Sequence, residues 1–384
     1  MYKKSFFFVT TIPGSLSFFN GQYKLLQQDF DVTAISSQRQ QLEQFGEQQG
    51  IKVHYIPMER EISLLKDFWG LCRFIMYFIK ECPLVVHGNT PKGSLLSMLA
   101  SWIVRVPVRI YMCHGLRYQG CNGFKRRLLM QMERISCKCA THVICVSKGV
   151  SEVLIEDKIT KKKPVVIWNG SVRGIDIKKF DPNKEYDKIG LKNKLGIKAE
   201  DYILTYVGRI VKDKGINELV EAFSVLSSRH FNMKLLLIGK MEMDGNPISA
   251  QSLQYIQENP AIIATGPQQD IPSFLSITDL FVFPSYREGF GLSLMEAGAM
   301  RVPSVATNII GCREVIEEGK TGLLIPSHSS TAIVEAVERL YNDKELYNTL
   351  KQSCRDSIIN RYEQKTLWDK YRDYYVHLVD GVRR

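Results

Sequence analysis

Short apolar runs alternate with longer amphipathic segments along most of the chain. A short apolar run between turn residues is typical of a strand buried on both faces, and a 3.6-residue period is typical of a helix that covers such strands. In the amino half this pattern predicts strands at 5–11, 32–36, 53–57, 83–87, 108–114, 142–146 and 164–168. It predicts helices between them at 62–80, 92–104, 123–138 and 148–156. The alternation predicts an α/β protein with a doubly wound parallel sheet.

The carboxyl half repeats the same plan. Its predicted strands are 202–207, 233–238, 261–264, 279–283 and 303–306, and its predicted helices are 215–228, 270–277 and 292–300. A polar, charged stretch that begins near Asp181 separates the two halves. With 384 residues the chain is long enough for two cores. We therefore predict one domain at 1–185, a second at 186–362 and a final helix at 363–384.

The composition is that of a globular protein, with 45% hydrophobic and 24% charged residues. No run approaches the ~18 apolar residues that a membrane-spanning helix needs. The first ten residues superficially resemble a signal peptide, but the short apolar run without a small-residue cleavage site favours a first buried strand. Nine cysteines without a Cys-x-x-Cys pair predict reduced thiols and a cytoplasmic protein.

The net charge of +11 is unevenly distributed. Residues 1–180 hold 26 basic and 13 acidic side chains, whereas residues 181–384 hold 25 and 27. Within the basic half, 123–134 is predicted to form a basic amphipathic helix, which can lie on an anionic membrane leaflet. The alternative is a solvated helix that packs on the sheet through its Leu and Met. A nucleic-acid partner is not expected, because no recognition motif is present and the aromatics are not interleaved with the charges.

Two glutamates enclose a glycine-rich segment that follows the apolar run at 279–283. Glu288 is expected on a loop at the carboxyl end of that strand, and Glu296 about two turns into the next helix. Ligands bind at this edge of an open α/β sheet, and free N–H groups at a helix start can bind anions or hydroxyls. Two carboxylates at different depths can grip different parts of a polyhydroxylated ligand. The alternative is an ordinary surface helix with two glutamates.

A second motif follows the strand predicted at 202–207. Arg209 and Lys214 lie five residues apart on a loop bounded by Gly208 and Gly215. Arg can bind a phosphate through two hydrogen bonds and Lys acts as a compact charge, so the pair suits a diphosphate. The alternative is that both cations are solvated loop charges.

At these residues the chain resembles the family-four retaining glycosyltransferases of the GT-B fold, over nearly its whole length. The segments that carry the resemblance are Gly208-Arg209, Lys214-Gly215, Leu235–Gly239, Thr265-Gly266, Asp279–Ser285, Glu288–Glu296, Thr321–Leu324, Cys113-His114-Gly115, Asn169-Gly170-Ser171 and Gly174-Ile175-Asp176. The resemblance implies two Rossmann-like domains that face an interdomain cleft. The amino domain would bind the acceptor and the carboxyl domain a nucleotide-sugar donor, and the last helix would cross back to the amino domain.

The resemblance also implies roles for individual residues. The catalytic residues would be Glu288, His114, Arg209 and Lys214. The substrate-binding residues would be Glu296, Gly289, Phe290, Gly291, Leu292, Gly208, Gly239, Gly266, Gly14 and Ser147. Gly14 is a candidate because the Gly-Gly loop that many relatives carry after the first strand is missing. No metal and no other cofactor is expected, and Asp29-Phe30-Asp31 is interpreted as the turn into the second strand.

The Pro-x-Ser-Leu pattern at 13–16, together with Asn169-Gly170-Ser171 and Gly174-Ile175-Asp176, resembles the subgroup that builds bacterial capsule, O-antigen or lipid-linked oligosaccharides. The implied donor is a UDP-sugar, with a guanosine nucleotide sugar as the alternative, and the implied acceptor is a polyprenyl-diphosphate-linked saccharide. The protein would be peripheral on the inner face of the cytoplasmic membrane, with its basic amino domain on the anionic surface. Two other functions remain open: a GT-B nucleotide-sugar epimerase or hydrolase, and a non-catalytic scaffold of a polysaccharide assembly complex.

Overall fold

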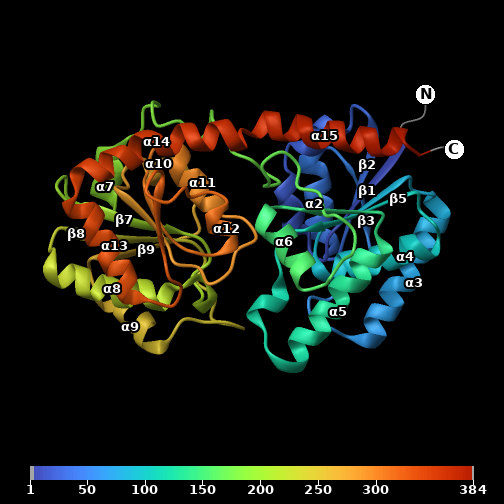
Figure 1. Cartoon of the computed structure of the whole chain (residues 1–384), viewed down its shortest axis with the longest axis horizontal. Coiled ribbons are helices and arrows are strands. Elements are labelled where there is room, and N and C mark those ends of the chain that lie inside the picture. Colours follow the sequence, from blue (N-terminus) through green and yellow to red (C-terminus); the bar gives the residue numbers. More distant parts are fainter. Residues whose placement is uncertain (1–3, 383–384) are drawn as a thin grey trace. The chain divides into compact units, whose positions relative to one another are not determined.

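The computed structural model describes residues 4–382, and these form two units with one six-stranded parallel sheet each (Figure 1). The first unit consists of the chain up to Gly174 and the segment from Gln364 onwards, and the second is Ile175–Glu363. The division lies earlier than the expected boundary at 185. Ile175 pairs with Glu363, and Phe180 is buried in the core of the second unit. The segment 175–185, which was expected to end the first domain, therefore belongs to the second unit.

The first sheet has the strand order β3-β2-β1-β4-β5-β6. Its strands are β1 (Lys4–Val9), β2 (Phe30–Ser36), β3 (Lys52–Tyr55), β4 (Val85–Gly88), β5 (Val108–Cys113) and β6 (His142–Cys145). The helices of this unit are α1 (Gln22–Leu26), α2 (Arg39–Gln49), α3 (Leu64–Glu81), α4 (Pro91–Ile103), α5 (Gly123–Cys139), α6 (Lys148–Glu156) and α15 (Gln364–Asp380), with 3-10 turns η1 (Pro13–Phe19) and η2 (Arg117–Gly120). The direction in which strands are added reverses between β1 and β4.

The second sheet repeats this topology in the order β12-β11-β10-β7-β8-β9. Its strands are β7 (Tyr202–Val207), β8 (Met233–Ile238), β9 (Ile262–Gly266), β10 (Leu280–Phe283), β11 (Ser304–Thr307) and β12 (Gly322–Ile325). Its helices are α7 (Lys188–Lys194), α8 (Ile216–Arg229), α9 (Ala250–Glu258), α10 (Ile271–Ser276), α11 (Leu292–Ala299), α12 (Ile310–Arg313), α13 (Ser330–Asn342) and α14 (Lys344–Tyr362), with the 3-10 turn η3 (Lys212–Lys214). Here the reversal lies between β7 and β10.

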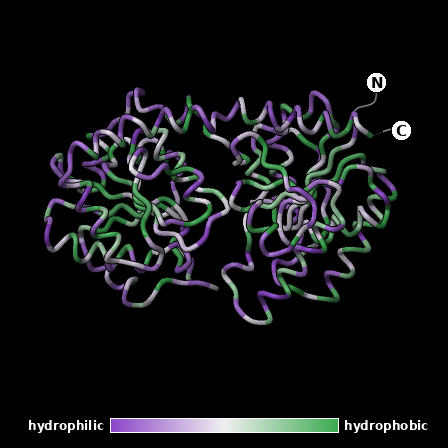
Figure 2. The backbone as a smooth tube through the Cα atoms, viewed as in Figure 1, coloured by the Kyte–Doolittle hydropathy of each residue, from purple (hydrophilic) through white to green (hydrophobic). Residues whose placement is uncertain are grey.

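The hydropathy of the chain follows these layers. In Figure 2 the strands inside each unit are mostly green, whereas the outer helices alternate between green and purple. Leu235, Leu236 and Leu237 on β8 are fully buried, because a central parallel strand is covered on both faces. The predicted α/β fold with two doubly wound sheets is confirmed.

Helix α15 packs on the first unit through a buried row at every fourth residue. This row consists of Leu367, Tyr371, Tyr375 and Val379. The Tyr375 hydroxyl lies 2.9 Å from Nε2 of His87 on β4, and the Tyr371 hydroxyl donates to the carbonyl of Ser171 at 2.7 Å. Helix α15 thus completes the hydrophobic core of the first unit, although it lies almost 200 residues further along the chain than Gly174.

Two predictions about elements were wrong or incomplete. The apolar segment 164–168 is not a strand, since only Val165 bridges to β6. Pro164 has no N–H to donate, and Trp168 has a φ of 52° that breaks the extended backbone. Strand β12 and helices α1, α2, α7, α9, α12, α13 and α14 were not predicted as elements. Among the described residues, no helix has both the length and the apolarity that crossing a bilayer requires.

Candidate active site

The predicted donor residues gather at the carboxyl edge of the second sheet. Gly208 follows β7, Gly239 follows β8, Gly266 ends β9, and Glu288 lies on the loop after β10. These strands are neighbours in the order β10-β7-β8-β9, so their ends share one edge. The reversal between β7 and β10 is the point at which open α/β sheets bind ligands.

Lys214 and Glu288 meet at this reversal point. The Lys214 ammonium donates to Oε1 of Glu288 in an ion pair, and the two side chains are only 16% and 15% exposed. The ammonium also lies 6.0 Å from the centre of the Phe283 ring. Because water screens a shielded pair less than a surface pair, this is a strong local field with both signs of charge. The structure therefore joins the cation loop and the glutamate loop, which the sequence leaves as separate motifs.

A glycine makes this approach of the two loops feasible. Gly215 has a φ of +70°, and a Cβ at this position would lie 2.0 Å from the carbonyl oxygen of Pro284. Any larger residue would push the loop after β7 away from the loop after β10. The position of Lys214 beside Glu288 thus depends on the residue that follows it.

A second close approach lies further along the edge. A Cβ on Gly239, whose φ is +151°, would lie 1.8 Å from the carbonyl oxygen of Gly208. The Gly239 N–H also donates to the carbonyl of Gly266 at 3.1 Å. The three glycine loops therefore pack backbone against backbone and present a surface without side chains, against which a ligand can lie closely.

Arg209 points to a different partner. Its guanidinium donates to Glu242 at 3.0 Å, and the side chain is 51% exposed. The Tyr206 hydroxyl donates to the Arg209 carbonyl at 2.9 Å and fixes the backbone there. The structure does not bring the Arg209 side chain into the Lys214–Glu288 pair.

The four predicted backbone donors fall into two groups. The Gly291 N–H donates to the Gly311 carbonyl at 3.0 Å, and the Leu292 N–H to the Phe290 carbonyl at 3.1 Å. The N–H groups of Gly289 and Phe290 donate to no other group within residues 4–382, so these two are open to a ligand. The Phe290 ring packs edge-on against Tyr362 at 5.3 Å.

Glu296 lies in the second turn of α11, as its spacing from Glu288 predicts. Its side chain is half-buried.

The sequence did not identify several residues around the site. Arg287 donates to Asp213 at 3.0 Å, and the Tyr286 hydroxyl lies 2.7 Å from both carboxylate oxygens of Glu218. A Cβ on Gly311 would lie 2.6 Å from Cβ of Glu288, so only a glycine at 311 leaves room for Glu288 in its present position. Arg287 and Asp213 adjoin predicted residues and were recognisable as charges. Gly311 was not, because only the pairing of β10 with β11 brings it near.

His114 lies in the first unit, directly after β5. Its Nε2 is 3.4 Å from Oδ1 of Asn89, and its ring stacks on Phe18 at 5.4 Å between centres. Burial lowers the pKa of His114 to about 4, so the imidazole is neutral at neutral pH. A neutral imidazole can accept or donate one hydrogen bond to a substrate hydroxyl.

The two remaining candidates in the first unit have local roles. Ser147 is fully buried, and its Oγ caps α6 by accepting from the Val150 N–H at 3.2 Å. Gly14 is exposed on η1, and a Cβ there would meet nothing within 4 Å. The backbone at 14 therefore has no steric need for glycine.

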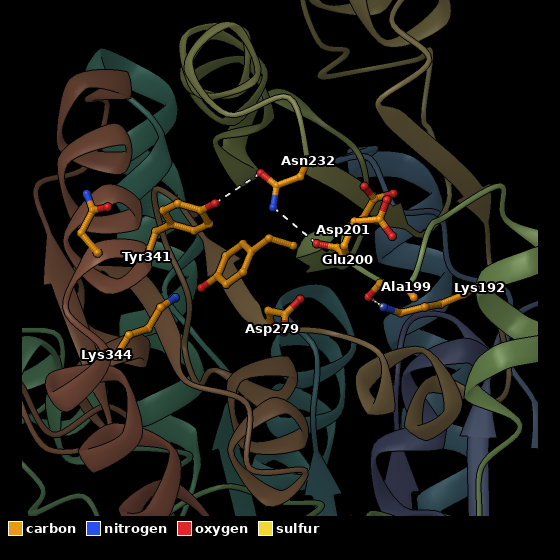
Figure 3. Close-up of a pocket in the computed structure, with 10 residues that line it drawn as sticks. Lys192, Ala199, Glu200, Asp201, Asn232, Asp279, Tyr341 and Lys344 are labelled. Atoms are coloured by element: carbon orange, nitrogen blue, oxygen red, sulfur yellow. Dashed lines mark hydrogen bonds between the residues drawn. The ribbon is translucent and has the colours of Figure 1, made fainter.

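A polar pocket of about 580 Å³ lies at the opposite edge of the second sheet (Figure 3). Asp201, Asn232 and Asp279 directly precede β7, β8 and β10, so they mark the amino ends of the strands. Asp279 accepts from the Ile203 N–H at 2.8 Å, and the Asn232 amide is bonded to Glu200 and Tyr341. Burial raises the pKa of Asp279. These contacts tie strand starts together, and we do not assign the donor site here.

The Asp-x-Asp segment is engaged in ion pairs of the first unit. Asp29 binds the guanidinium of Arg372 on α15, and Asp31 binds Lys52 at 2.6 Å. Asp29 precedes β2 and Asp31 lies in it, as the interpretation as a turn into the second strand expects. In the part of the chain that the structure describes, no group of three or more His, Cys, Asp or Glu side chains converges in a way that could hold a metal ion.

Two family models match the chain. Residues 24–171 match Glycosyltransferase Family 4, and residues 187–357 match Glycosyl transferases group 1. The chain is 34% identical to the capsular polysaccharide biosynthesis glycosyltransferase CapM of Staphylococcus aureus, over 98% of this chain and 97% of that protein. It is 27% identical to UDP-Gal:alpha-D-GlcNAc-diphosphoundecaprenol alpha-1,3-galactosyltransferase of Escherichia coli, over 93% and 92% of the two chains.

Solved structures share the fold over the whole chain. A glycosyltransferase from Rickettsia africae superposes with a TM-score of 0.80 at 20% identity and covers 100% of both chains. Anabaena Alr3699/HepE in complex with UDP superposes with a TM-score of 0.78 at 18% identity and covers 98% of this chain and 100% of its own. At these identities the likeness establishes the architecture alone.

Proposed function

Because this chain belongs to the glycosyltransferases of the GT-B fold, we propose that it transfers a sugar from a UDP-sugar to a saccharide carried on a polyprenyl diphosphate. Two relatives support the proposal through their names: the Staphylococcus aureus protein acts in capsule synthesis, and the Escherichia coli protein uses UDP-Gal and a diphosphoundecaprenol acceptor. The pathway we propose is therefore the synthesis of a cell-surface polysaccharide.

The observation that carries the proposal is the shielded Lys214–Glu288 pair at the reversal point of the second sheet. Transfer breaks the bond between the anomeric carbon and the phosphate oxygen, so negative charge develops on the leaving UDP. A fixed cation aimed at that oxygen stabilises the transition state more than the ground state. Lys214 supplies this charge, and Glu288 binds hydroxyls of the donor sugar.

The surrounding groups bind the rest of the donor. Arg209 exchanges Glu242 for the diphosphate, and the free N–H groups of Gly289 and Phe290 donate to phosphate or sugar oxygens. Glu296 accepts from the ribose hydroxyls. The glycine surface formed by Gly208, Gly239 and Gly266 lets the nucleotide lie against the backbone.

We further propose that transfer retains the anomeric configuration and needs no metal ion. The acceptor hydroxyl attacks on the face from which UDP departs, and the leaving phosphate takes its proton. Neutral His114 hydrogen-bonds a sugar hydroxyl during this step. The Lys and Arg side chains supply the positive charge that a divalent ion supplies elsewhere. The lipid-linked acceptor implies that the protein works as a peripheral protein on the inner face of the cytoplasmic membrane.

The test is thermal denaturation with UDP, with UDP-sugars and with EDTA present throughout. A ligand that binds only the folded protein raises the melting temperature by mass action. We expect UDP to stabilise the protein and Lys214→Ala to lose that stabilisation. Arg229→Ala is the control, because Arg229 forms a surface ion pair with Glu338 in the same unit at 2.9 Å.

Other outcomes identify the competing functions. If no nucleotide stabilises the protein, the donor site is wrong and the scaffold function is favoured. If a product forms from the UDP-sugar without any acceptor, the protein is an epimerase or a hydrolase.

A further inference from the structure

Helix α3 exposes large apolar side chains to an unusual extent. Leu65, Phe68, Trp69, Met76 and Ile79 are 59–79% exposed, and we call these five residues the α3 stripe. The opposite side of the helix is anchored in the core through Gly70, Phe74 and Phe78. An exposed apolar patch of this size on a folded unit marks an interaction surface.

The stripe is narrow and straight. At about 100° per residue, its five positions fall within an arc of about 100° on the helix. Three cations, Lys66, Arg73 and Lys80, are spaced by seven residues and therefore form a row beside the stripe. Amphipathic helices that lie in a membrane interface combine such an apolar face with flanking Lys and Arg.

The cation row has only solvent-exposed partners within the described residues. Arg73 forms no ion pair with any described residue, Lys66 pairs with exposed Glu59, and Lys80 is 3.7 Å from exposed Glu81. The one acidic residue in the first turn, Asp67, is turned inward, where it binds buried Lys92 at 2.7 Å. The outer side of α3 therefore carries positive charge, which an anionic surface would attract.

Neighbouring helices extend the same character. Helix α4 packs beside α3 and ends in exposed Trp102 and Ile103. Helix α5 packs on α4 and carries Phe124, which is 81% exposed, in its first turn, followed by three exposed cations at 125–127. Trp is enriched where protein meets the interfacial layer of a bilayer. Figure 1 shows α3, α4 and α5 as neighbours in the first unit.

We propose that the α3 stripe inserts into the headgroup layer of an anionic bilayer leaflet, with the cation row on the lipid phosphates. The sequence places membrane contact on the helix at 123–134; here the main contact is α3, and α5 contributes only its first turn. A second copy of this chain fits the surface less well, because a twofold contact would bring two identical cation rows into one interface. The strongly basic residues 1–180, with 26 basic and 13 acidic side chains, favour the anionic leaflet as well.

This proposal deepens the proposed function, which supplies a lipid-linked acceptor as the reason to approach a bilayer. Vesicle binding and nucleotide binding are separate measurements, so either proposal can fail alone. UDP-induced stabilisation reports on the second unit, and vesicle flotation reports on α3.

The experiment is flotation of the full chain with vesicles of 30% phosphatidylglycerol in phosphatidylcholine, and with phosphatidylcholine alone. We expect binding to the anionic vesicles only, with weaker binding at high salt. Phe68→Ser/Trp69→Ser should weaken binding by at least about tenfold, because two large apolar side chains leave the lipid. The control is Phe231→Ser, since Phe231 is 89% exposed in the second unit. Both variants should keep the wild-type melting temperature and UDP response.

Two further readouts locate the contact. Arg73→Glu/Lys80→Glu should abolish the preference for anionic lipid while the α3 stripe is intact. Brominated lipids should quench the tryptophan fluorescence of the wild type more than that of Trp69→Phe. The proposal is overturned if the serine variant floats like the wild type, if quenching is independent of Trp69, or if the stripe instead holds a dimer that the serine variant dissociates.

Discussion

The two sheets have the same strand order, yet their carboxyl edges are built from different chemistry. The edge of the second sheet carries the charged Lys214–Glu288 and Arg287–Asp213 pairs on glycine-rich loops. The edge of the first sheet carries neutral His114, stacked on Phe18 and bonded to Asn89. One edge suits a highly charged diphosphate, and the other suits sugar hydroxyls that need hydrogen bonds without net charge.

The comparison shows that topology sets where a site lies, whereas loop residues set what it binds. Both sheets reverse direction at their centre, at β1/β4 and at β7/β10. In both units a glycine lies close to the backbone of a neighbouring segment at that point: a Cβ on Gly215 would lie 2.0 Å from the carbonyl oxygen of Pro284, and a Cβ on Gly93 would lie 3.0 Å from the backbone nitrogen of Thr11. The approach is tighter in the second unit, whereas a Cβ on Gly14, in the loop after the first strand of the first unit, would meet no atom within 4 Å.

The largest expected effect is on sugar transfer, and it distinguishes the roles of the carboxyl edges of the two sheets. Removing one preorganised charge or donor typically lowers kcat by ~10²–10³, so Lys214→Ala and His114→Asn should both lose transfer by about that factor. Only Lys214→Ala should also lose UDP affinity, because His114 is assigned to the sugar and not to the diphosphate. Calorimetry with UDP and steady-state kinetics give the two readouts. Equal loss of UDP affinity in both variants would contradict the division of roles.

The second prediction compares the two glycines. Gly215→Ala should destabilise the protein by about 2–4 kcal/mol, since the new Cβ overlaps a carbonyl in a left-handed backbone region. Gly14→Ala should change the free energy of unfolding by less than about 0.5 kcal/mol, as expected for a surface position. Urea denaturation followed by circular dichroism measures both. Similar stabilities of the two variants would show that the loop after β7 is free to move.

The third prediction concerns acid. Burial lowers the pKa of His87 in the first unit to about 3, so the unfolded chain takes up this proton first as the pH falls below 6.5. Stability is complete above the unfolded pKa and decreases between pH 7 and 5 by about 2 kcal/mol for this group. His87→Leu should remove that part of the pH dependence, whatever its effect at pH 7. Exposed His377→Leu is the control, and an unchanged slope in the His87 variant would refute the assignment.

The smallest effect concerns the partner of Arg209. Glu242 forms an ion pair with the half-exposed guanidinium of Arg209, which a bound diphosphate would need. Such surface ion pairs contribute ~0.2–1 kcal/mol of interaction free energy. Glu242→Gln should therefore tighten UDP binding about twofold to fivefold at low salt. Glu338→Gln, which breaks a pair remote from the site, should leave it unchanged. Weaker binding in Glu242→Gln would show that the carboxylate holds Arg209 in place for the ligand.

The sequence predicted the fold well because both sheets are parallel. Their strands are buried on both faces and appear as short apolar runs, of which 202–207 and 233–238 match β7 and β8 at both ends. Helices such as α13 and α14 were missed because the strand and motif signals nearby took precedence over their amphipathic pattern. The prediction of a strand at 164–168 was wrong because apolar residues can also cover a hydrophobic core without pairing in a sheet.

The sequence predicts candidate site residues, but it does not predict the contacts between them. Motifs identify candidates within one loop, so Glu288 and Lys214 were each predicted, but their ion pair depends on β7 lying beside β10. Gly311 is close to Glu288 only through β11, which no local pattern reveals. The exposure of the α3 stripe was equally invisible, since a helix pattern does not tell which of its apolar positions face the sheet.

The placement of α15 has a consequence for folding of the protein during its synthesis on the ribosome. The second unit is continuous in sequence and can fold as soon as it emerges, whereas the first unit is complete only after α15 has been synthesised. At roughly 5–20 residues per second, the ring cluster of Phe6 and His87 stays without Tyr375 for roughly 10–40 s after residue 174 is made. During that interval the nascent chain carries an uncovered aromatic surface, so we expect it to be a chaperone client and a truncated 1–174 fragment to aggregate.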